Sequence, residues 1–294
     1  MSEKQMSNFK IGFIGAGKMG APMCTNIIKK GNYPVWVYRG RVDEIAALGG
    51  IKCNSLEEIT KNCNVIISVV PGNNEVKEVV DGLLPYIKKG TIYIDMSTIS
   101  PDTSKKLAEK VKSAGCVMMD IPVVKSEGAA IAGNLGIYVG GDHKTYEKIR
   151  PILECMGKPE EIIYYGTNGS GLAMKMCHNM LVGIIQNGVN EMLVMAKAAG
   201  IDYDKIGPGI RAGGGQNFYL DAKAESIKTQ DFTPRFSFKN MHKDMHLIIK
   251  FANSLGLNLV GAKRVLKIYD SGIEELGSED FSATIKILEK MVKK

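Results

Sequence analysis

The fold is decided by residues 11–20, which read IGFIGAGKMG. The first four residues are typical of a short buried strand. They run into a glycine turn and then into an apolar helical pattern that ends near Gly31. Strand, turn and helix in this order form the first half of a βαβ unit. The start of the chain therefore predicts an α/β fold.

The glycines of this turn have the G-x-G-x-x-G spacing of dinucleotide-binding sites. The first glycine allows a tight turn, the second lets a pyrophosphate approach the backbone, and the third lets helix and strand pack closely. The helix N-terminus adds donors for the phosphates. The alternative is a glycine turn used only for packing. The residues expected to line a dinucleotide are Gly15, Ala16, Gly17, Lys18, Met19 and Gly20.

Arginines follow the second predicted strand, residues 35–38, about 20 residues after the turn, where an acid normally binds the ribose hydroxyls of NAD. Arg39 and Arg41 can instead hold a 2′-phosphate by charge-assisted bonds. Asp43 lies too far into the next helical pattern to replace the missing acid. We therefore favour NADP(H) over NAD(H), with two solvated loop arginines as the alternative.

Apolar runs alternate with helical patterns up to about Gly166, which predicts βαβ units and a parallel sheet. From residue 172 to 199 an apolar run without proline predicts a long helix buried on most sides. The later segments favour helix. The predicted fold is α/β, with a Rossmann-like doubly wound N-terminal domain, 1–167, and an all-α C-terminal domain, 168–294, joined by the long central helix.

Charge and cysteine usage exclude several classes of protein. The 294 residues carry a net charge of +7 with dispersed basic residues, which suits a small anionic molecule and argues against a nucleic-acid partner. The six cysteines are scattered and indicate neither a zinc site nor disulfides. Residues 1–10 lack an apolar signal core, and no stretch approaches the ~20 apolar residues of a membrane span. We expect a soluble cytoplasmic protein without a membrane partner.

Five ordered motifs resemble the β-hydroxyacid dehydrogenases, which include 3-hydroxyisobutyrate dehydrogenase, tartronate semialdehyde reductase and, more distantly, 6-phosphogluconate dehydrogenase. The motifs are residues 12–23, 95–101, 120–123, 169–171 with Lys175 and Asn179, and 242–244. The resemblance covers almost the whole chain. It implies an NAD(P)-dependent oxidoreductase with its active site in a cleft between two domains, and a homodimer or homotetramer.

Lys175 is the candidate catalytic residue. A charged amine is unexpected in an apolar helix unless it faces a cavity. The resemblance implies that it gives a proton to the carbonyl oxygen as hydride arrives, and removes it in the reverse direction. Asn179 falls one helical turn later on the same face and is expected to orient the substrate. His178 points about 100° away, and we expect it to pack or form a local hydrogen bond.

Further site residues follow the predicted strands, because ligands bind at the carboxyl ends of an open parallel sheet. Ser97 and Thr98 can each contact the nicotinamide or the substrate, and we assign Ser97 to the substrate and Thr98 to the cofactor. Val70 and Pro71 are expected to line the cofactor crevice. The resemblance implies that Lys243, from the C-terminal domain, contacts both substrate and cofactor. The alternative for Lys243 is an exposed helix lysine.

His242 and His246 are four residues apart and can share a helix face. The sequence offers them no acidic or cysteine partner in a recognisable pattern, so no metal site is expected.

The most informative departure from the family follows residues 120–123, where typical members continue with Ser-Gly-Gly. This chain has Val124, Lys125 and Ser126. Sulfolactaldehyde reductases of the family look similar, with a basic and a hydroxyl residue that hold a sulfonate. Lys125 and Ser126 are therefore candidate substrate-binding residues.

Three substrate classes remain open. Sulfolactaldehyde, and a short carboxylated semialdehyde such as tartronate or succinic semialdehyde, rank equally, because a lysine serves a carboxylate as well as a sulfonate. A 3-hydroxyisobutyrate-like acid ranks third. A non-catalytic NADP-binding protein is the alternative from another class, which the retained Lys175 and Asn179 argue against. Imine reductases usually lack lysine at the catalytic position.

Overall fold

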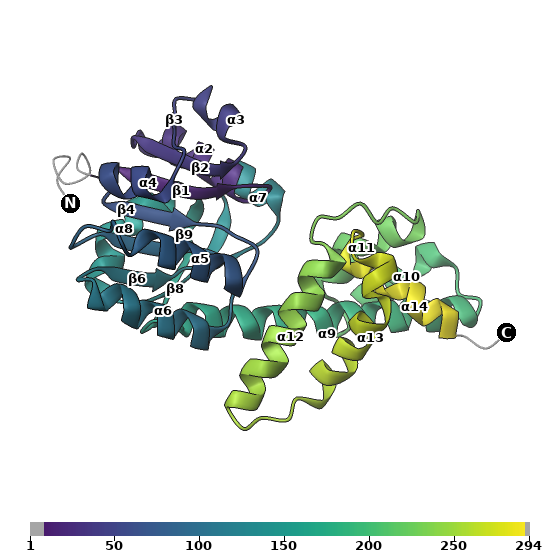
Figure 1. The fold of residues 1–294 in the computed structure, drawn as a ribbon. Helices are drawn as coiled ribbons and strands as arrows, with labels where there is room; N and C mark the ends of the chain where they lie inside the picture. Colours follow the sequence, from purple (N-terminus) through teal and green to yellow (C-terminus); the bar gives the residue numbers. More distant parts are fainter. Residues whose placement is uncertain (1–8, 292–294) are drawn as a thin grey trace. The chain divides into compact units, whose positions relative to one another are not determined.

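The structure is a computed structural model that describes residues 9–291. Most of the polar segment 1–10 therefore lies outside the described residues. The chain forms two compact units, 1–175 and 176–294 (Figure 1). The expected domain boundary at 167/168 lies just before helix α9, Ser170–Ala198. The division between the two compact units lies inside that helix, after Lys175.

A nine-stranded sheet forms the centre of the first unit. Parallel strands run in the order β3-β2-β1-β4-β5-β6, and β8 follows, paired with β6, β7 and β9. The strands are β1 Ile11–Ala16, β2 Val35–Gly40, β3 Ile51–Lys52, β4 Val65–Ser68, β5 Ile92–Asp95, β6 Val117–Asp120, β7 Val123–Val124, β8 Leu135–Gly140 and β9 Gly157–Gly166.

Helices cover both faces of the sheet, because neighbouring residues of its buried strands point to opposite sides. Phe13 packs with buried residues of α2, α7 and α8, whereas Ile14 packs with buried residues of α4, α5 and α6. The doubly wound architecture is confirmed. The helices of this unit are α2 Gly20–Gly31, α3 Val42–Ala46, α4 Leu56–Asn62, α5 Asn73–Leu83, α6 Pro101–Ser113, α7 Glu127–Ala132 and α8 His143–Glu154.

The predicted parallel sheet is found in strands β1 to β6, but the direction changes at β8. This strand runs antiparallel to both β6 and β7, and parallel to β9. The chain returns from β7 to β8 through the short helix α7, which is too short for the long crossover that a parallel pairing needs. The substrate segment 120–126 therefore lies at a change of strand direction.

The second unit is helical, as predicted. Its core is formed by apolar residues from α9 and all the later helices, among them Phe238, Met241 and Tyr269. The helices after α9 are α10 Tyr203–Arg211, α11 Phe218–Lys228, α12 Phe238–Ser254, α13 Val260–Leu276 and α14 Thr284–Met291, with a short 3-10 turn at Phe281–Ala283. Within residues 9–291, no helix combines the length and apolar character needed to cross a membrane.

Candidate active site

The glycine turn has the shape that a dinucleotide needs. Gly15 has a positive φ of 94°, and a Cβ there would collide with the carbonyl oxygen of Val69. A Cβ on Gly20 would collide with the carbonyl oxygen of Gly15, so helix α2 packs closely on β1. A Cβ on Gly17 would have no described atom within 4 Å. Gly17 thus faces open space at the start of a helix, which fits a pyrophosphate against the backbone.

The other residues of the turn differ in their surroundings. Ala16 is buried, whereas Met19 is only partly buried. Lys18 lies 3.5 Å from the carboxylate of Glu127, at the start of α7, and its side chain is about half exposed. Lys18 therefore offers its charge at the surface beside the turn.

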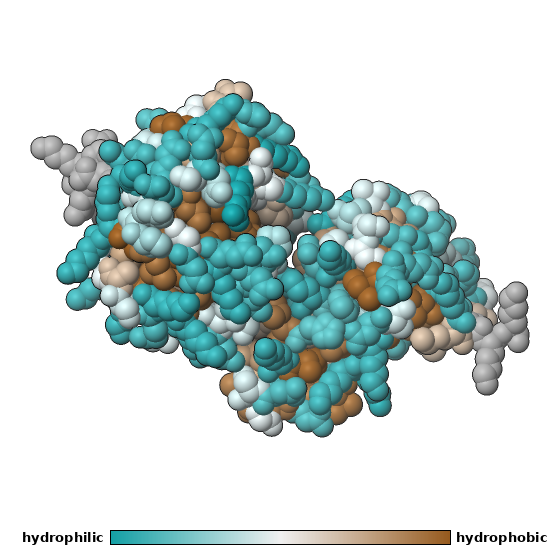
Figure 2. All heavy atoms as spheres, viewed as in Figure 1, coloured by the Kyte–Doolittle hydropathy of each residue, from teal (hydrophilic) through white to brown (hydrophobic). Residues whose placement is uncertain are grey.

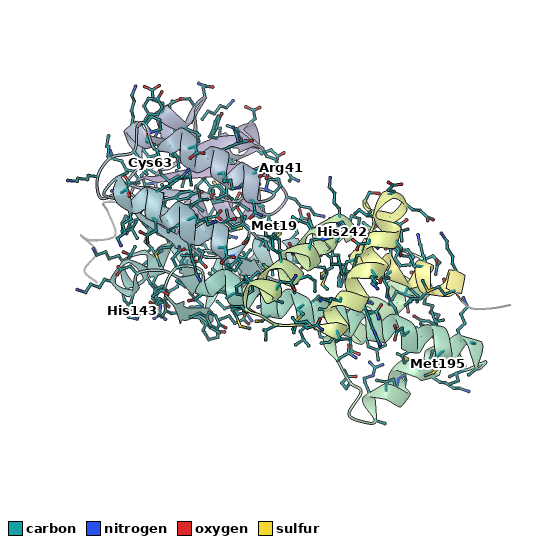
Figure 3. The ribbon with its side chains drawn as sticks, turned by 60° about the horizontal axis from the view of Figure 1, so that its bottom comes forward. Met19, Arg41, Cys63, His143, Met195 and His242 are labelled. Atoms are coloured by element: carbon teal, nitrogen blue, oxygen red, sulfur yellow. The ribbon has the colours of Figure 1, made fainter. Side chains whose placement is uncertain are left out.

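Arg39 and Arg41 are brought to the glycine turn by strand pairing. Ile14 pairs with Tyr38, and the N–H of Arg41 donates to the carbonyl oxygen of Ala16 at 2.8 Å. Arg41 and Met19 lie at the same edge of this unit (Figure 3). Both arginines are exposed; the Arg39 guanidinium lies 5.2 Å from the Tyr38 ring centroid, and Arg41 approaches Glu44 at 3.8 Å.

Asp43 does not occupy the place of the missing acid. Its carboxylate accepts a hydrogen bond from Lys52 on β3, and this bond lowers the pKa of the Asp43 carboxyl group. The acid is thus engaged with a lysine on the outer strand of the sheet. The two arginines remain the charged groups at the carboxyl end of β2, with Arg39 in its last two residues and Arg41 directly after it.

The carboxyl ends of β4 and β5 are tied together by Ser97. Its Oγ accepts a 2.9 Å hydrogen bond from the N–H of Val70, and its own N–H donates to Asp95 Oδ1 at 3.2 Å. Ser97 is 3% exposed, so its hydroxyl forms part of the wall at this edge. Thr98 is partly buried and Pro71 is exposed.

A buried polar network connects β4 and β5 next to these carboxyl ends. Ser68 Oγ donates to Asp95 Oδ1 at 2.8 Å and lies 2.8 Å from the Tyr93 hydroxyl. Burial and the Asp95 carboxylate hold the pKa of the Tyr93 hydroxyl well above its usual value, so Tyr93 stays a donor. Sequence reasoning missed this network. The alternation of polar and apolar residues in β5 was the available signal.

Lys175 is buried in the first unit, at 8% exposure, although it carries a charged amine. Its Nζ donates a 2.8 Å hydrogen bond to the carbonyl oxygen of Val123, in β7. Val123 lies just beyond the carboxyl end of β6, which pairs with β5, the strand that precedes Ser97. The lysine amine therefore reaches the edge of the sheet at which ligands of open α/β folds bind.

The helix that carries Lys175 is anchored by Asp120, a residue that sequence analysis placed in a motif without assigning it a role. Its carboxylate accepts hydrogen bonds from the N–H groups of Gly169 at 2.6 Å and Leu172 at 2.8 Å, at the start of α9. These N–H groups would otherwise lack partners. Burial raises the pKa of Asp120 to about 6, although the two backbone hydrogen bonds oppose this shift.

Two further glycines fix the start of α9 against the sheet. A Cβ on Gly171 would lie 2.7 Å from the carbonyl oxygens of Asp120 and Tyr138, and one on Gly140 would lie 2.7 Å from the Gly171 nitrogen. Both contacts are far below van der Waals distance. Helix and strand therefore meet backbone to backbone, one helical turn before Lys175.

Asn179 is buried in the second unit, and both ends of its amide are engaged. Nδ2 donates to Asp244 Oδ2 at 2.6 Å, and Oδ1 lies 2.9 Å from His178 Nδ1. The local hydrogen bond expected of His178 is confirmed. Lys243 Nζ lies 3.2 Å from Asp244 Oδ1, so Asp244, which is 2% exposed, connects α12 to α9. Sequence analysis missed this role of Asp244.

The ammonium of Lys125 does not stand free to meet an anion. It forms an ion pair with Glu161 on β9 and donates to the carbonyl oxygen of Asn134 at 2.9 Å. Its backbone has a φ of 81°, a conformation that favours glycine, so the lysine stands at a position suited to the glycine of typical family members. Ser126 follows at the start of α7 and is exposed.

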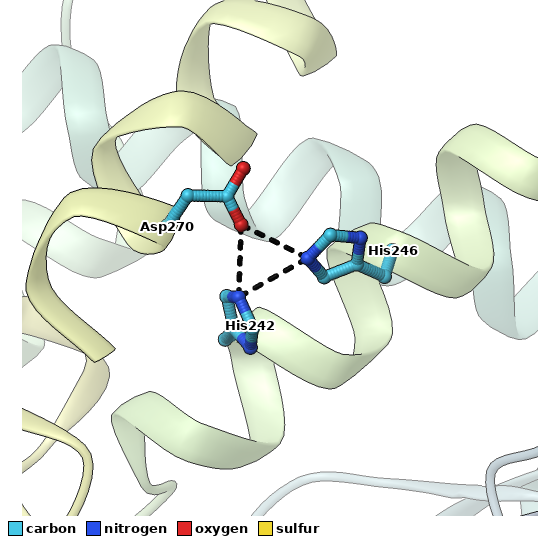
Figure 4. Close-up of side chains that lie close together, drawn as sticks. All are labelled: His242, His246 and Asp270. Atoms are coloured by element: carbon cyan, nitrogen blue, oxygen red, sulfur yellow. Dashed lines mark hydrogen bonds and ion pairs between the residues drawn. The ribbon is translucent and has the colours of Figure 1, made fainter. Parts of the chain in front are cut away.

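The expectation that His242 and His246 lack an acidic partner is wrong. Asp270, from the neighbouring helix α13, lies 2.9 Å from the Nε2 atoms of both histidines (Figure 4). The partner is 24 residues from His246 and belongs to another helix. A pattern within one helix could not reveal it.

Comparison with known families agrees with this geometry. Residues 10–166 match the family model described as the NAD binding domain of 6-phosphogluconate dehydrogenase. Residues 169–288 match the model described as NAD-binding of NADP-dependent 3-hydroxyisobutyrate dehydrogenase. The chain belongs to the 3-hydroxyisobutyrate dehydrogenase family of β-hydroxyacid dehydrogenases. It is an NAD(P)-dependent oxidoreductase, as its sequence predicted.

Relatives from this family match almost the full chain. The 2-hydroxy-3-oxopropionate reductase of Escherichia coli is 32% identical over 96% of this chain and 98% of its own. The NAD-dependent L-serine dehydrogenase of Pseudomonas aeruginosa is 30% identical over 95% and 98%. Among solved structures, Mycobacterium tuberculosis 3-hydroxyisobutyrate dehydrogenase with L-serine has a TM-score of 0.89 at 29% identity and covers 95% and 99%.

Proposed function

We propose that this dehydrogenase uses NADP(H) to reduce a short carboxylated semialdehyde to its hydroxy acid, with 2-hydroxy-3-oxopropionate, which is tartronate semialdehyde, as the leading substrate. The observation that carries the proposal is the buried amine of Lys175 at the carboxyl edge of the sheet. The similarity to the E. coli reductase supports this substrate class.

Lys175 acts as the general acid in this proposal. NADPH, when bound at the glycine turn, would supply the hydride that reduces the aldehyde. Lys175 gives one proton to the carbonyl oxygen, so that the aldehyde becomes an alcohol, and takes the proton back in the oxidation direction. Its hydrogen bond to Val123 keeps the amine directed to one place, which limits the reorientation needed before proton transfer.

Polar side chains would orient the substrate. We assign this role to Ser97, Lys125 and Ser126 of the first unit and to Asn179 and Lys243 of the second. Asp244 holds Asn179 by a 2.6 Å bond, which would fix the amide for substrate. Lys243 is also assigned to the cofactor, together with Thr98, Val70 and Pro71.

The preference for NADP(H) is assigned to Arg39 and Arg41. Two exposed guanidinium groups lie at the carboxyl end of β2, and Asp43 is engaged with Lys52. An adenosine 2′-phosphate would gain charge-assisted hydrogen bonds there, whereas a free ribose hydroxyl would find no carboxylate.

The ion pair of Lys125 with Glu161 compensates the lysine charge for a carboxylate and a sulfonate alike. The ranking of the carboxylated semialdehyde first therefore rests on the similarity to the E. coli reductase. Sulfolactaldehyde stays the second candidate, because Lys125 and Ser126 supply a basic and a hydroxyl group side by side, and an ion pair this exposed is weak enough to open.

The deciding experiment measures initial rates of NADPH and NADH oxidation with 2-hydroxy-3-oxopropionate, succinic semialdehyde, methylmalonate semialdehyde and sulfolactaldehyde at equal concentrations. The proposal expects the highest kcat/KM with NADPH and 2-hydroxy-3-oxopropionate. A dominant rate with sulfolactaldehyde that falls at least about tenfold in K125A, but not in the control K158A, would reassign the substrate to a sulfonate. Rates at background with all four compounds would overturn the proposal.

We further propose that the enzyme is a homodimer or homotetramer formed through its helical unit. Large apolar side chains stand exposed on this unit, and apolar patches interrupt its hydrophilic surface around the turn between α12 and α13 (Figure 2). The exposed residues are Leu181, Met195, Ile201, Phe218, Leu255, Leu257 and Val260. Light scattering should give two or four times the chain mass, and a monomer at micromolar concentration would contradict the proposal.

A further inference from the structure

Three metal-ligating side chains converge on the surface of the helical unit, apart from the residues assigned to catalysis. His242 and His246 are one turn apart on α12, and Asp270 reaches them from α13 (Figure 4). Asp270 Oδ1 lies 2.9 Å from each Nε2, and the two Nε2 atoms lie 3.1 Å apart. Three donor atoms thus form a nearly equilateral triangle.

Hydrogen bonds satisfy this triangle poorly while Asp270 is ionised. If neither Nε2 carries a hydrogen, two nitrogen lone pairs face a carboxylate oxygen. If one nitrogen carries it, the other still directs its lone pair at the oxygen from 2.9 Å. If both carry it, both can donate to Asp270 Oδ1, but two N–H groups of like partial charge then lie 3.1 Å apart. With an ionised Asp270, each of these states leaves like groups in at least one of the three short contacts.

A metal ion removes this conflict, because it attracts all three lone pairs at once. Zinc binds histidine nitrogen and carboxylate oxygen at about 2.0–2.2 Å, so neighbouring ligand atoms of a tetrahedral site lie roughly 3.3–3.6 Å from one another. The observed spacings of 2.9–3.1 Å are shorter by about half an ångström, and small rotations of these partly exposed side chains would reach the tetrahedral value. We propose that His242, His246 and Asp270 bind a divalent transition-metal ion of the zinc class, with water completing its coordination.

The ligand set selects the class of metal. Two imidazoles and one carboxylate suit Zn²⁺, Ni²⁺ and Cu²⁺, whereas Mg²⁺ and Ca²⁺ prefer sites made of oxygen alone. The site is open to solvent: the side chains of His246 and Asp270 are 53% and 46% exposed, and that of His242 is 20% exposed. An ion can therefore enter without local unfolding.

Metal binding would clamp α12 to α13. Met241, Met245 and Tyr269 already pack in the core of this unit, so the ion would tie together, at the surface, two helices that meet beneath it. Lys243 and Asp244 directly follow His242 on the clamped helix. Because the ion would only connect α12 to α13, its proposed role is structural, without a part in hydride or proton transfer.

The experiment titrates Zn²⁺ into the full-length protein, prepared without a histidine tag, by isothermal calorimetry. We expect one site in the wild type, no heat with Mg²⁺, and an affinity at least about tenfold lower in H246Q and in D270N, since loss of even an outer-shell partner commonly costs that much. Both substituted side chains are exposed, so the fold should persist.

Two matched controls exclude other ligands. H143Q removes an exposed histidine of α8, and C177S removes the exposed free thiol. Both should bind Zn²⁺ as the wild type does. Zinc should also slow amide hydrogen exchange in α12 and α13 of the wild type but not of H246Q. The proposal would be overturned if H246Q bound Zn²⁺ as tightly as the wild type, or if C177S lost binding. It would also be overturned if the wild type, at about 10 µM, bound no Zn²⁺ at a 100-fold excess of the metal.

Discussion

The Nζ atom of Lys175 donates a 2.8 Å hydrogen bond to the carbonyl oxygen of Val123, so the amine of the first turns of α9 is tied to strand β7. Val123 is followed closely by Lys125, whose ammonium is bound to Glu161. The backbone group that holds the proposed acid and the proposed determinant of substrate choice thus lie two residues apart on one short segment, at Val123 and Lys125.

Substitution of Lys175 by methionine should abolish turnover, because methionine fills similar space but carries no proton. We expect kcat to fall by roughly 10²–10⁴, the usual share of a general acid. The dissociation constant for NADPH, measured by fluorescence titration, should change less than about threefold. K112M, an exposed lysine of α6, is the control. Turnover of K175M within threefold of wild type would assign the proton to another group.

Substitution of Arg39 by aspartate should shift the cofactor preference toward NADH. Arg39 has a φ of 65°, which aspartate tolerates better than most residues, so the backbone should be kept. Loss of charge-assisted bonds to a phosphate, about 1.5–3 kcal/mol, predicts a fall of the NADPH/NADH ratio of kcat/KM by roughly 10- to 100-fold. R150D, on α8, should leave the ratio unchanged. An unchanged ratio in R39D would remove Arg39 from the cofactor site.

Asp120 should make the stability of the first unit depend on pH. Its pKa is raised from 3.8 to about 6, so the folded state binds more protons than the unfolded state between these values. Stability conferred by this group is therefore present below about pH 4 and falls as pH rises to about 6, by at most about 3 kcal/mol. Denaturant unfolding of wild type and D120N from pH 4 to 7 should show their difference falling with pH.

Asp142 provides a control of opposite sign. It caps α8, and hydrogen bonds from Thr145 lower the pKa of its carboxyl group. Its contribution should be present above about pH 4 and lost as pH falls, so D142N should differ from wild type mainly at neutral pH. A pH-independent difference between wild type and D120N would show that the Asp120 carboxyl group titrates alike in the folded and unfolded states.

The helical unit depends on a buried ion pair. Lys223 Nζ lies 2.8 Å from Asp280 Oδ1, with 8% and 3% of the two side chains exposed. Substitution of Lys223 by methionine leaves a buried carboxylate without its cation and should lower the free energy of unfolding by about 3–5 kcal/mol. K286M breaks a half-exposed pair with Glu279 and should cost about 1 kcal/mol or less. Equal effects of the two substitutions would contradict this ranking.

Sequence reasoning predicted the parts of the protein that depend on local patterns. The glycine turn, the doubly wound sheet and the long helix follow from periodicity and spacing within single segments, and the structure confirms them. The antiparallel direction of β8 was missed, because the pattern of a single strand does not give the direction of its neighbours. The short helices α4 and α7 were also missed, because segments of six or seven residues carry too little periodicity.

The groups that position the site were missed for a different reason. Asp120, Asp244 and Asp270 act through partners 24 to 65 residues away. Such pairs form only once the helices have packed, and a single sequence does not show which distant residues lie close together in space. For Lys125, the sequence predicted a basic group near the substrate, but it did not predict the ion pair with Glu161. The cytoplasmic location stays a prediction.

The close contact of Gly140 with Gly171 has a consequence for how this protein can evolve. Neither position accepts even a methyl group, so the start of α9 is set by this main-chain contact together with the Asp120 carboxylate, and not by the side chains of residues 124–126. Substitutions at residues 124–126 can therefore accumulate without moving the lysine at position 175. Substrate choice can therefore change through residues 124–126 while Lys175 keeps its place and the reaction stays the same.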